Sequence, residues 1–451
     1  MKIVIVGGGD VGYHFAEWLA QEKKEVVVID ISPEALRRVS EQLDVQTLLG
    51  SGSNPRILEE SGLKTADTIL AVTDSDEVNL IACFFANVIA PPIQKVALIR
   101  NPDYLLYRTA LTRDILNIGL VINPEMEVVN SILRIMSAPE VEEVNDFMGG
   151  RVKMLGKYLG PESPLCGLKL MQLPDKIEHH RMIIAALVRD EALIIPKGKD
   201  TLKPGDFVYF VCQSPDIDRI LHLFGKQTMP LKNILVVGGG SIGFPLAREL
   251  ESRRLNVKLI EKDPERCQMI SAKLKRTIVL QGFATDQKFL EQENIGHMDM
   301  VVAVTWDEEM NILSSLLAKR LGAKKTIARV NKVPYIPLVQ TIGIDHIVSP
   351  RLSAINSIFP FMRRGKVIST VNIRGKAAEV LEVEALPTSA IVGTPIKDLQ
   401  FPKEALFLCI FRGNEVIIPS GSSVIQAEDR VLILSTGAVI PLVEQALMAK
   451  R

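Results

Sequence analysis

Two glycine-rich runs have the residue types and spacing that hold a phosphate. Gly7, Gly9 and Gly12 form a Gly-x-Gly-x-x-Gly pattern, and residues 238–243 repeat it. In such a pattern the first glycine permits a tight turn, the second lets a pyrophosphate approach the backbone, and the third lets a helix pack closely on a strand. The N-terminus of that helix then faces the anion. Both runs therefore predict a cradle for a nucleotide diphosphate.

An acidic residue follows each glycine run. Asp30 and Glu261 each stand at the end of the next apolar run, EVVVID in the first case and NVKLIE in the second. A carboxylate there accepts hydrogen bonds from ribose hydroxyls and repels a 2′-phosphate, which disfavours NADP. The alternative is a solvated acid or a cap at the end of a strand.

The two glycine runs differ at one position that bears on phosphate binding. Asp10 stands where the second run has Ser241. A carboxylate beside a diphosphate costs Coulomb energy, whereas a hydroxyl can donate a hydrogen bond. If Asp10 points inward, we expect the second site to hold phosphate more tightly.

Further polar residues follow later strands. Thr73 and Thr305 open the runs TDSDE and TWDEE, at strand ends where ligands bind in parallel α/β folds. The acids of these runs either cap the following helix or bind a cation. Arg100 and Arg329 lie near another strand end, in registers that are not equivalent, and either neutralise phosphates or lie at a surface or interface.

Short apolar strands that alternate with helical patterns must position these residues. Such alternation indicates a parallel sheet with right-handed crossovers, which is an α/β fold. In the first half we expect strands at 3–6, 25–30, 45–49 and 68–73 and helices at 13–20 and 33–42.

The chain is one unit written twice. IVIVGGGDVG at 3–12 matches ILVVGGGSIG at 234–243, and a second matched segment follows each of them, at 192–210 and 415–434. The order is therefore large unit, small unit, large unit, small unit. We place the large, nucleotide-binding units at 1–137 and 229–362 and the small units at 138–228 and 363–451.

Charge and hydropathy exclude several classes of protein. Lys+Arg and Asp+Glu are both 53, so the formal net charge is zero, which argues against nucleic acid as a partner. The longest apolar stretch, residues 80–90, is well short of the ~20 residues of a membrane span. The five cysteines form no Cys-x-x-Cys pair and no metal spacing, so we expect buried, reduced thiols in a cytosolic protein.

The groups that a dehydrogenase needs are missing. Such an enzyme places a proton donor and a substrate site beside the nicotinamide, but the small units are poor in candidates and the chain has no Tyr-x-x-x-Lys pair. A duplicated binding module without chemical groups indicates a sensor. An NAD-dependent oxidoreductase and a scaffold with degenerate sites are the rival interpretations.

Taken together, the chain resembles the TrkA family, the peripheral subunits of Trk potassium-uptake systems, which consist of two tandem domains that regulate K⁺ conductance (RCK domains). The resemblance covers essentially the whole chain. Its most specific signs are the two GGGxxG openings, the runs that end at Asn79 and Asn311, and Ile-Pro-x-Gly at 195–198 and 418–421. It implies two Rossmann-like, doubly wound parallel-sheet domains, each followed by a small α+β domain.

The resemblance also implies a function. It implies a regulatory subunit without enzyme activity that binds NAD(H), or alternatively ATP/ADP, and gates an integral-membrane K⁺-translocating subunit. The expected assembly is a homotetramer at the cytoplasmic face of the cell membrane. Residues 123–136 and 349–362 would be crossover hinges or plain interdomain helices.

The resemblance adds contacts from the loop after the third strand, residues 50–53 and 282–285, although the family's aspartate is missing there. The cofactor-binding residues that we expect are Gly7, Gly8, Gly9, Asp10, Val11, Gly12, Asp30, Ser51, Thr73 and Arg100 in the first half, and Gly238, Gly239, Gly240, Ser241, Ile242, Gly243, Glu261, Phe283, Thr305 and Arg329 in the second.

Overall fold

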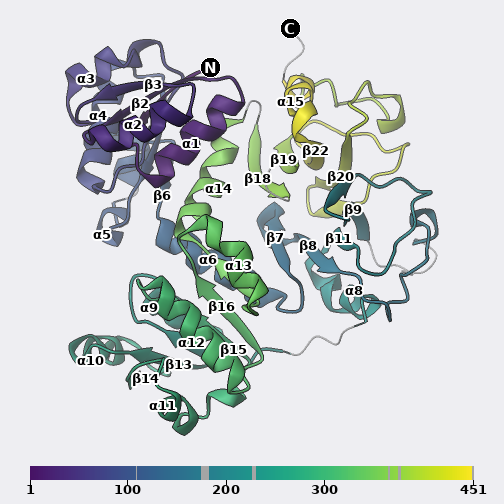
Figure 1. Ribbon diagram of the computed structural model, residues 1–451. Coiled ribbons are helices and arrows are strands. Elements are labelled where there is room, and N and C mark those ends of the chain that lie inside the picture. Colours follow the sequence, from purple (N-terminus) through teal and green to yellow (C-terminus); the bar gives the residue numbers. More distant parts are fainter. Residues whose placement is uncertain (108, 174–181, 226–229, 364–365, 374–376, 449–451) are drawn as a thin grey trace.

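A computed structural model of the chain describes residues 1–107, 109–173, 182–225, 230–363, 366–373 and 377–448. It contains two six-stranded parallel sheets and two five-stranded antiparallel sheets, which alternate along the chain (Figure 1). This confirms the predicted fold class of two Rossmann-like domains, each followed by a small α+β domain. The exact boundaries stay a prediction, and the one at 228–229 lies outside the described residues.

The first parallel sheet has the strand order β3-β2-β1-β4-β5-β6, the doubly wound order that places ligands at the carboxyl ends of the central strands. Its buried strands are runs of Val, Ile, Leu and Ala, as expected for a sheet with helices on both faces. The strands are β1 (Lys2–Val6), β2 (Glu25–Asp30), β3 (Gln46–Leu49), β4 (Thr68–Ala71), β5 (Gln94–Leu98) and β6 (Leu120–Ile122); the helices are α1 (Asp10–Gln21), α2 (Pro33–Gln42), α3 (Pro55–Glu60), α4 (Asp76–Ile89) and α5 (Pro102–Leu105).

The second parallel sheet repeats this order as β14-β13-β12-β15-β16-β17. Several helices in both halves begin with a polar cap followed by proline, for example Asp263 before Pro264, a pairing that satisfies the first amides and presets the helical φ. The strands are β12 (Asn233–Val237), β13 (Asn256–Glu261), β14 (Ile278–Gln281), β15 (Met300–Ala303), β16 (Lys325–Arg329) and β17 (His346–Val348); the helices are α9 (Gly243–Ser252), α10 (Pro264–Lys273), α11 (Gln287–Gln292), α12 (Glu308–Arg320) and α13 (Ile336–Thr341).

The two small domains pack their sheets face to face around one shared core. Tyr209 and Ala186 of the first lie in the same buried cluster as Leu432 and Cys409 of the second. Their elements are β7 (Glu143–Phe147), β8 (Val152–Tyr158), β9 (Met182–Arg189), β10 (Ala192–Ile194), β11 (Phe207–Gln213) and α8 (Ile217–Leu223), then β18 (Val367–Ile373), β19 (Ala378–Glu384), β20 (Ala405–Arg412), β21 (Glu415–Ile417), β22 (Arg430–Thr436) and α15 (Ile440–Leu447).

Two crossover helices exchange places between the halves. Helix α6 (Pro124–Ser137) follows the first parallel sheet, yet its Val128 and Ile132 lie in the core of the second. Helix α14 (Pro350–Met362) follows the second sheet, yet Phe359 lies in the core of the first, edge-on to Trp18 with ring centroids 4.5 Å apart. The two helices cross between the Rossmann domains (Figure 1). The halves are therefore interlocked, and the predicted linear partition does not describe this packing.

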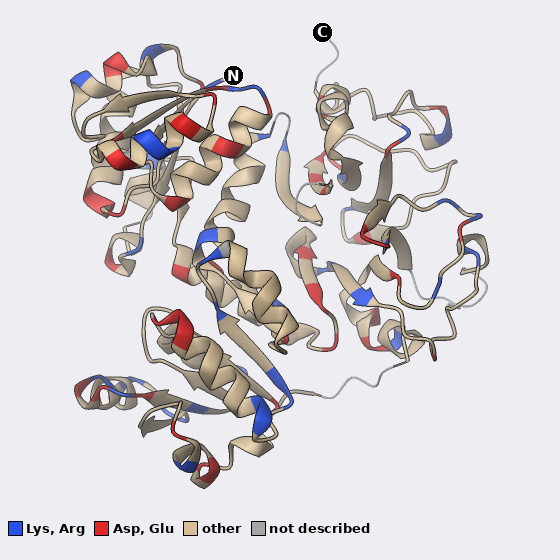
Figure 2. Cartoon of the chain, in the orientation of Figure 1, with Lys and Arg blue, Asp and Glu red and all other residues tan. Residues whose placement is uncertain are grey.

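Charges of both signs are spread over the chain, and the cysteines are buried only in part, although the sequence predicted buried thiols. Basic and acidic residues interleave over both Rossmann domains (Figure 2). Cys83, Cys212 and Cys409 are buried, which raises the pKa of each thiol to about 12, but Cys166 and Cys267 are only partly buried. Within the described residues, no helix combines the length and apolarity needed to cross a bilayer.

Candidate functional site

The first glycine run forms a tight turn between β1 and α1. Gly7 has φ +108°, which disfavours any side chain, and a Cβ on Gly12 would lie 1.8 Å from the Gly7 carbonyl oxygen. Gly9 caps α1 in an extended conformation, with open space where a Cβ would be. The first and third glycines thus shape the turn, and the second leaves the backbone open above the N-terminus of the helix.

Asp30 closes the side of this turn. Its carboxylate accepts hydrogen bonds from the amides of Gly8 at 2.5 Å and Ser32 at 2.7 Å. Each carboxylate oxygen has a further lone pair, and Asp30 lines the cavity in front of the turn. The acid therefore both braces the loop and presents an acceptor to the cavity.

A buried asparagine holds the end of β4. Asn79 is fully buried, accepts from the Thr73 amide and hydroxyl at 2.9 and 2.7 Å, and donates to the carbonyls of Thr73 and Leu98. Asn311 makes the same bonds to Thr305 and to the carbonyl of Arg329. The asparagine that ends each matched run is thus a brace between neighbouring strands.

The acids after β4 also brace the loops. Asp76 accepts from the amides of Arg100 and Asn101, while Ser75 caps α4. In the second half Glu308 accepts from the amide of Asn331 at 3.0 Å. In the first half Ser75 is therefore the cap and Asp76 binds loop amides, whereas in the second half an acid is the cap, because Asp307 accepts from the Met310 amide at 3.0 Å at the start of α12.

The same contacts fix the register of the two arginines. The counterpart of Arg100 is Asn331, and the counterpart of Arg329 is Leu98. The arginines therefore occupy different places, as the unequal registers indicated. Arg100 donates to the Thr73 carbonyl at 3.1 Å and to Asp74 at 2.9 Å.

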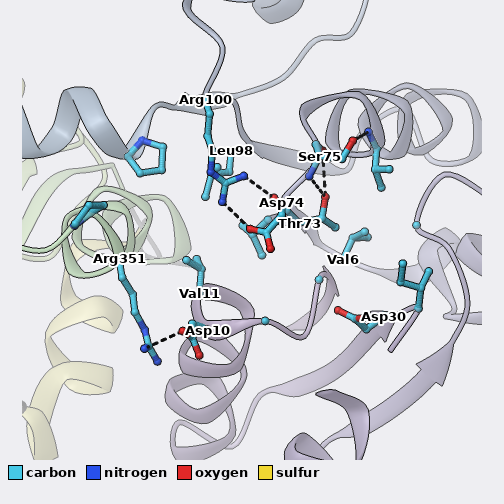
Figure 3. A pocket seen from close by; sticks show the side chains of 18 of the residues that line it. Val6, Asp10, Val11, Asp30, Thr73, Asp74, Ser75, Leu98, Arg100 and Arg351 are labelled. Atoms are coloured by element: carbon cyan, nitrogen blue, oxygen red, sulfur yellow. Dashed lines mark hydrogen bonds and ion pairs between the residues drawn. The ribbon is translucent and has the colours of Figure 1, made fainter. Parts of the chain in front are cut away.

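The cavity in front of the first glycine turn has a volume of about 790 Å³ and is built from both halves of the chain (Figure 3). One wall comes from the first Rossmann domain and the start of α6. The opposite wall comes from the second half and consists of Trp306, Arg329, Asn331, Pro350 and Arg351.

Two arginines of this opposite wall carry charge toward the cavity. Arg351 pairs with Asp10 at 3.4 Å (Figure 3), and Arg38 pairs with the other oxygen of that carboxylate at the same distance. Arg329 is 5% exposed and stacks 4.5 Å above the Trp306 ring. Burial lowers the pKa of Arg329, against the opposing effect of two nearby glutamates, and its Nε has no hydrogen-bond partner among the described residues.

A second, smaller cavity of about 300 Å³ lies at the second glycine turn. Gly238 has φ +97°, and Glu261 accepts from the amide of Gly239 at 2.8 Å and from that of Lys262 at 2.8 Å. Arg266 donates to the Gly239 carbonyl at 3.1 Å. Among the described residues, only the second half contributes to this lining.

The predicted residues fall into three groups. Those that line the first cavity are Gly7, Gly9, Asp10, Val11, Asp30, Ser51, Thr73, Arg100 and also Arg329, which was expected in the second site. Those that line the second are Gly238, Gly240, Glu261, Phe283 and Thr305. Those that shape the turns without lining either cavity are Gly8, Gly12, Gly239, Ser241, Ile242 and Gly243.

Comparison with known proteins gives the family. The family model "TrkA-N domain" matches residues 3–124 and 234–350, and the model "TrkA-C domain" matches 158–225 and 380–447. These matches cover most of the chain, both glycine turns included. The chain belongs to the TrkA family. This confirms the resemblance seen in the sequence.

Relatives within the TrkA family match over the full length. The "Trk system potassium uptake protein TrkA" of Azorhizobium caulinodans is 36% identical over 99% of this chain and 98% of its own. That of Halomonas elongata is 36% identical over 96% of this chain and 95% of its own. Among solved structures, "Crystal Structure of the GsuK RCK domain" has a TM-score of 0.59 at 17% identity, over 99% of this chain and 94% of that one. At that identity the likeness shows the fold.

Sequence reasoning missed the wall that joins the two TrkA-N domains. Trp306, Arg351 and Arg266 line the cavities but were not singled out. For Arg351 a signal existed, because aligning IVSPR at 347–351 with VINPE at 121–125 sets Arg351 against Glu125. At this position the two halves therefore differ in the sign of their charge.

Proposed function

We propose that the chain is the nucleotide-binding regulatory subunit of a Trk-type potassium-uptake system. It binds NAD(H), with ATP/ADP as the alternative ligand, at the two glycine turns. It acts at the cytoplasmic face of the membrane, as a homotetramer, on an integral-membrane K⁺-translocating subunit. The nucleotide acts as a signal in this proposal: a ligand that binds one arrangement of the domains more tightly shifts the population toward it.

The observation that carries the proposal is the pairing of an open glycine turn with a strand-end carboxylate, twice in one chain. Gly9 and Gly240 leave room beside the N-termini of α1 and α9, and Asp30 and Glu261 present acceptors to the same cavities. Helix N-termini attract phosphate, and a carboxylate here suits ribose hydroxyls. These features favour two nucleotide sites in one chain.

The names of related proteins support the same reading. The relatives are named as Trk system potassium uptake proteins. A structure titled "GsuK channel bound to NAD" has a TM-score of 0.61 with this chain at 17% identity, over 99% of this chain and 78% of that one. Another is titled "Crystal structure of the GsuK bound to ADP". Dinucleotide and mononucleotide are thus both reasonable ligands to test.

The cavity linings support binding without chemistry. Among the described residues, neither cavity is lined by a histidine, cysteine or tyrosine, the side chains that most often transfer a proton or form a covalent intermediate. The polar residues present either brace loops or carry charge toward the cavity. An NAD-dependent oxidoreductase is the alternative, and steady consumption of NADH would favour it.

Two experiments test the proposal. Thermal shifts with NAD, NADH, ATP and ADP measure binding, because a specific ligand at about 100 times its Kd stabilises the folded state by about 2.7 kcal/mol. Potassium flux through the membrane subunit in proteoliposomes, with and without this chain and each nucleotide, measures regulation. We expect a nucleotide-dependent change in flux and no consumption of NADH. Flux that is indifferent to the chain, or steady NADH oxidation, would overturn the proposal.

A further inference from the structure

The first cavity has an ion pair that the second cannot form. Asp10 opens α1, Arg351 lies in the first turn of α14, and the two form the only salt bridge between α1 and the start of α14 among the described residues. The matched positions in the repeat are Ser241 and Glu125. A serine and a glutamate make no ion pair, so the duplicated sites differ in charge across the boundary between the halves.

The contacts of Arg351 would allow it to exchange Asp10 for another anion. Its pair with Asp10 is long, at 3.4 Å, and Asp10 keeps a second cation, Arg38, when Arg351 leaves. The Nε of Arg351 is buried and has no hydrogen-bond partner among the described residues. The guanidinium also lines the cavity that the glycine turn opens onto (Figure 3).

A second arginine in the same cavity points to the same ligand chemistry. Arg329 is buried, lines the cavity, and donates to the Thr305 carbonyl at 3.3 Å, while its Nε has no hydrogen-bond partner among the described residues. Both arginines line the same cavity, and arginine binds phosphate through its planar set of charged donors. The residues at the matched positions, Glu125 and Leu98, could not do this.

We propose that Arg351 is a phosphate ligand supplied across the boundary between the halves: the polyphosphate of a nucleotide in the first cavity takes Arg351 from Asp10. This rests on the proposed function, since it requires a nucleotide at the first turn. Binding of a nucleotide at the first site would then change a contact made by the second half of the chain, whereas binding at the second site would not.

Helix α14 connects the first cavity to the second small domain. Arg351 lies in its first turn, and its Phe359 packs on Trp18 of the first Rossmann domain. Directly after the helix, buried Arg363 pairs with Glu379 of β19 at 2.6 Å. A change of partner at the start of α14 therefore acts on a packed element that ends in the second small domain.

The test uses the full chain and ADP as the probe, with calorimetry to resolve two classes of site. Arg351→Gln should weaken the first site by about 10-fold or more, since a hydrogen bond to a charged group is lost. Asp10→Ser should strengthen it, because Arg351 is then unpaired and a repelling carboxylate is gone. Arg266→Gln, at the second cavity, is the matched control and should change only the second site.

Hydrogen exchange supplies a readout that a merely structural role would not move. In the wild type, saturating ADP should slow amide exchange in β18 and β19, and in Arg351→Gln that change should be absent even when the first site is saturated. Unchanged first-site affinity in Arg351→Gln, or weaker binding in Asp10→Ser, would overturn the inference. If ADP, ATP and NADH bind at neither site of the wild type, the proposed function itself fails.

Discussion

The central glycine of the first turn offers a substitution that separates binding from folding. Gly9 has φ −63° and ψ −169°, an extended conformation that alanine adopts readily, and no atom lies within 4 Å of the place of a Cβ. A methyl group there projects into the space that the diphosphate needs. We therefore expect Gly9→Ala to fold normally and to bind nucleotide poorly at the first site.

Two small effects on stability oppose each other in Gly9→Ala. Replacing glycine where φ is negative stabilises a protein by about 0.4–1 kcal/mol through the unfolded chain. Alanine is a poorer N-cap than glycine, by an amount of similar size, roughly 0.5–1 kcal/mol. The free energy of unfolding should therefore stay within about 1 kcal/mol of the wild type. Nucleotide affinity at the first site should fall at least about 10-fold, or about 1.4 kcal/mol.

Gly12→Ala is the matched contrast three residues along. Its Cβ would lie 1.8 Å from the Gly7 carbonyl oxygen, so the turn and helix must separate by an ångström or more. Overpacking of this kind destabilises by about 1–3 kcal/mol. Urea denaturation and ADP titration of both variants check the pair. Loss of stability in Gly9→Ala, or normal first-site binding in it, would refute this account of the turn.

Three further substitutions probe the elements that support the sites. Asn79→Ala removes four hydrogen bonds at the end of β4 and should destabilise the first Rossmann domain by about 2–4 kcal/mol in urea denaturation; a cost below 1 kcal/mol would mean that the amide is not a brace. Arg363→Met leaves Glu379 buried without its partner and should destabilise by about 3–5 kcal/mol; little change would show that the pair is dispensable. Burial lowers the pKa of His346 from 6.5 to about 4, so the neutral ring stabilises the fold above pH 6.5 and this contribution is lost as the pH falls toward 4. Over that range the free energy of unfolding should drop by up to about 3 kcal/mol, and His346→Gln should abolish that part of the pH dependence.

Local sequence predicted the elements because each rests on short-range physics. The strands at 3–6 and 25–30 and the helix at 33–42 are set by runs of buried β-branched residues, by glycine turns and by a Ser-Pro start. These three elements agree with the observed bounds within one residue, whereas α1 begins at Asp10, three residues before the predicted helix at 13–20, and β4 ends at Ala71, two residues before the end of the predicted strand at 68–73. Repeated spacing also predicted the duplication, because each half builds its own sheet.

The exchange of α6 and α14 could not be predicted in this way. Val128 lies on the apolar face of α6 and Phe359 on that of α14. An apolar face predicts that the helix is buried on that side, but not which domain buries it. The two Rossmann domains have nearly the same shape, so local pattern does not decide which one covers which helix. The composite first cavity follows from this exchange, and so does the place of Arg329 in its wall.

The number of nucleotides that one chain binds tests the central claim most directly. Equilibrium dialysis of the wild-type chain against labelled ADP or NADH should give two molecules per chain, falling to one in Gly9→Ala or Gly240→Ala and to none in the double variant. Two bound molecules in the double variant, or none in the wild type at millimolar nucleotide, would contradict the claim that the glycine turns hold the phosphates.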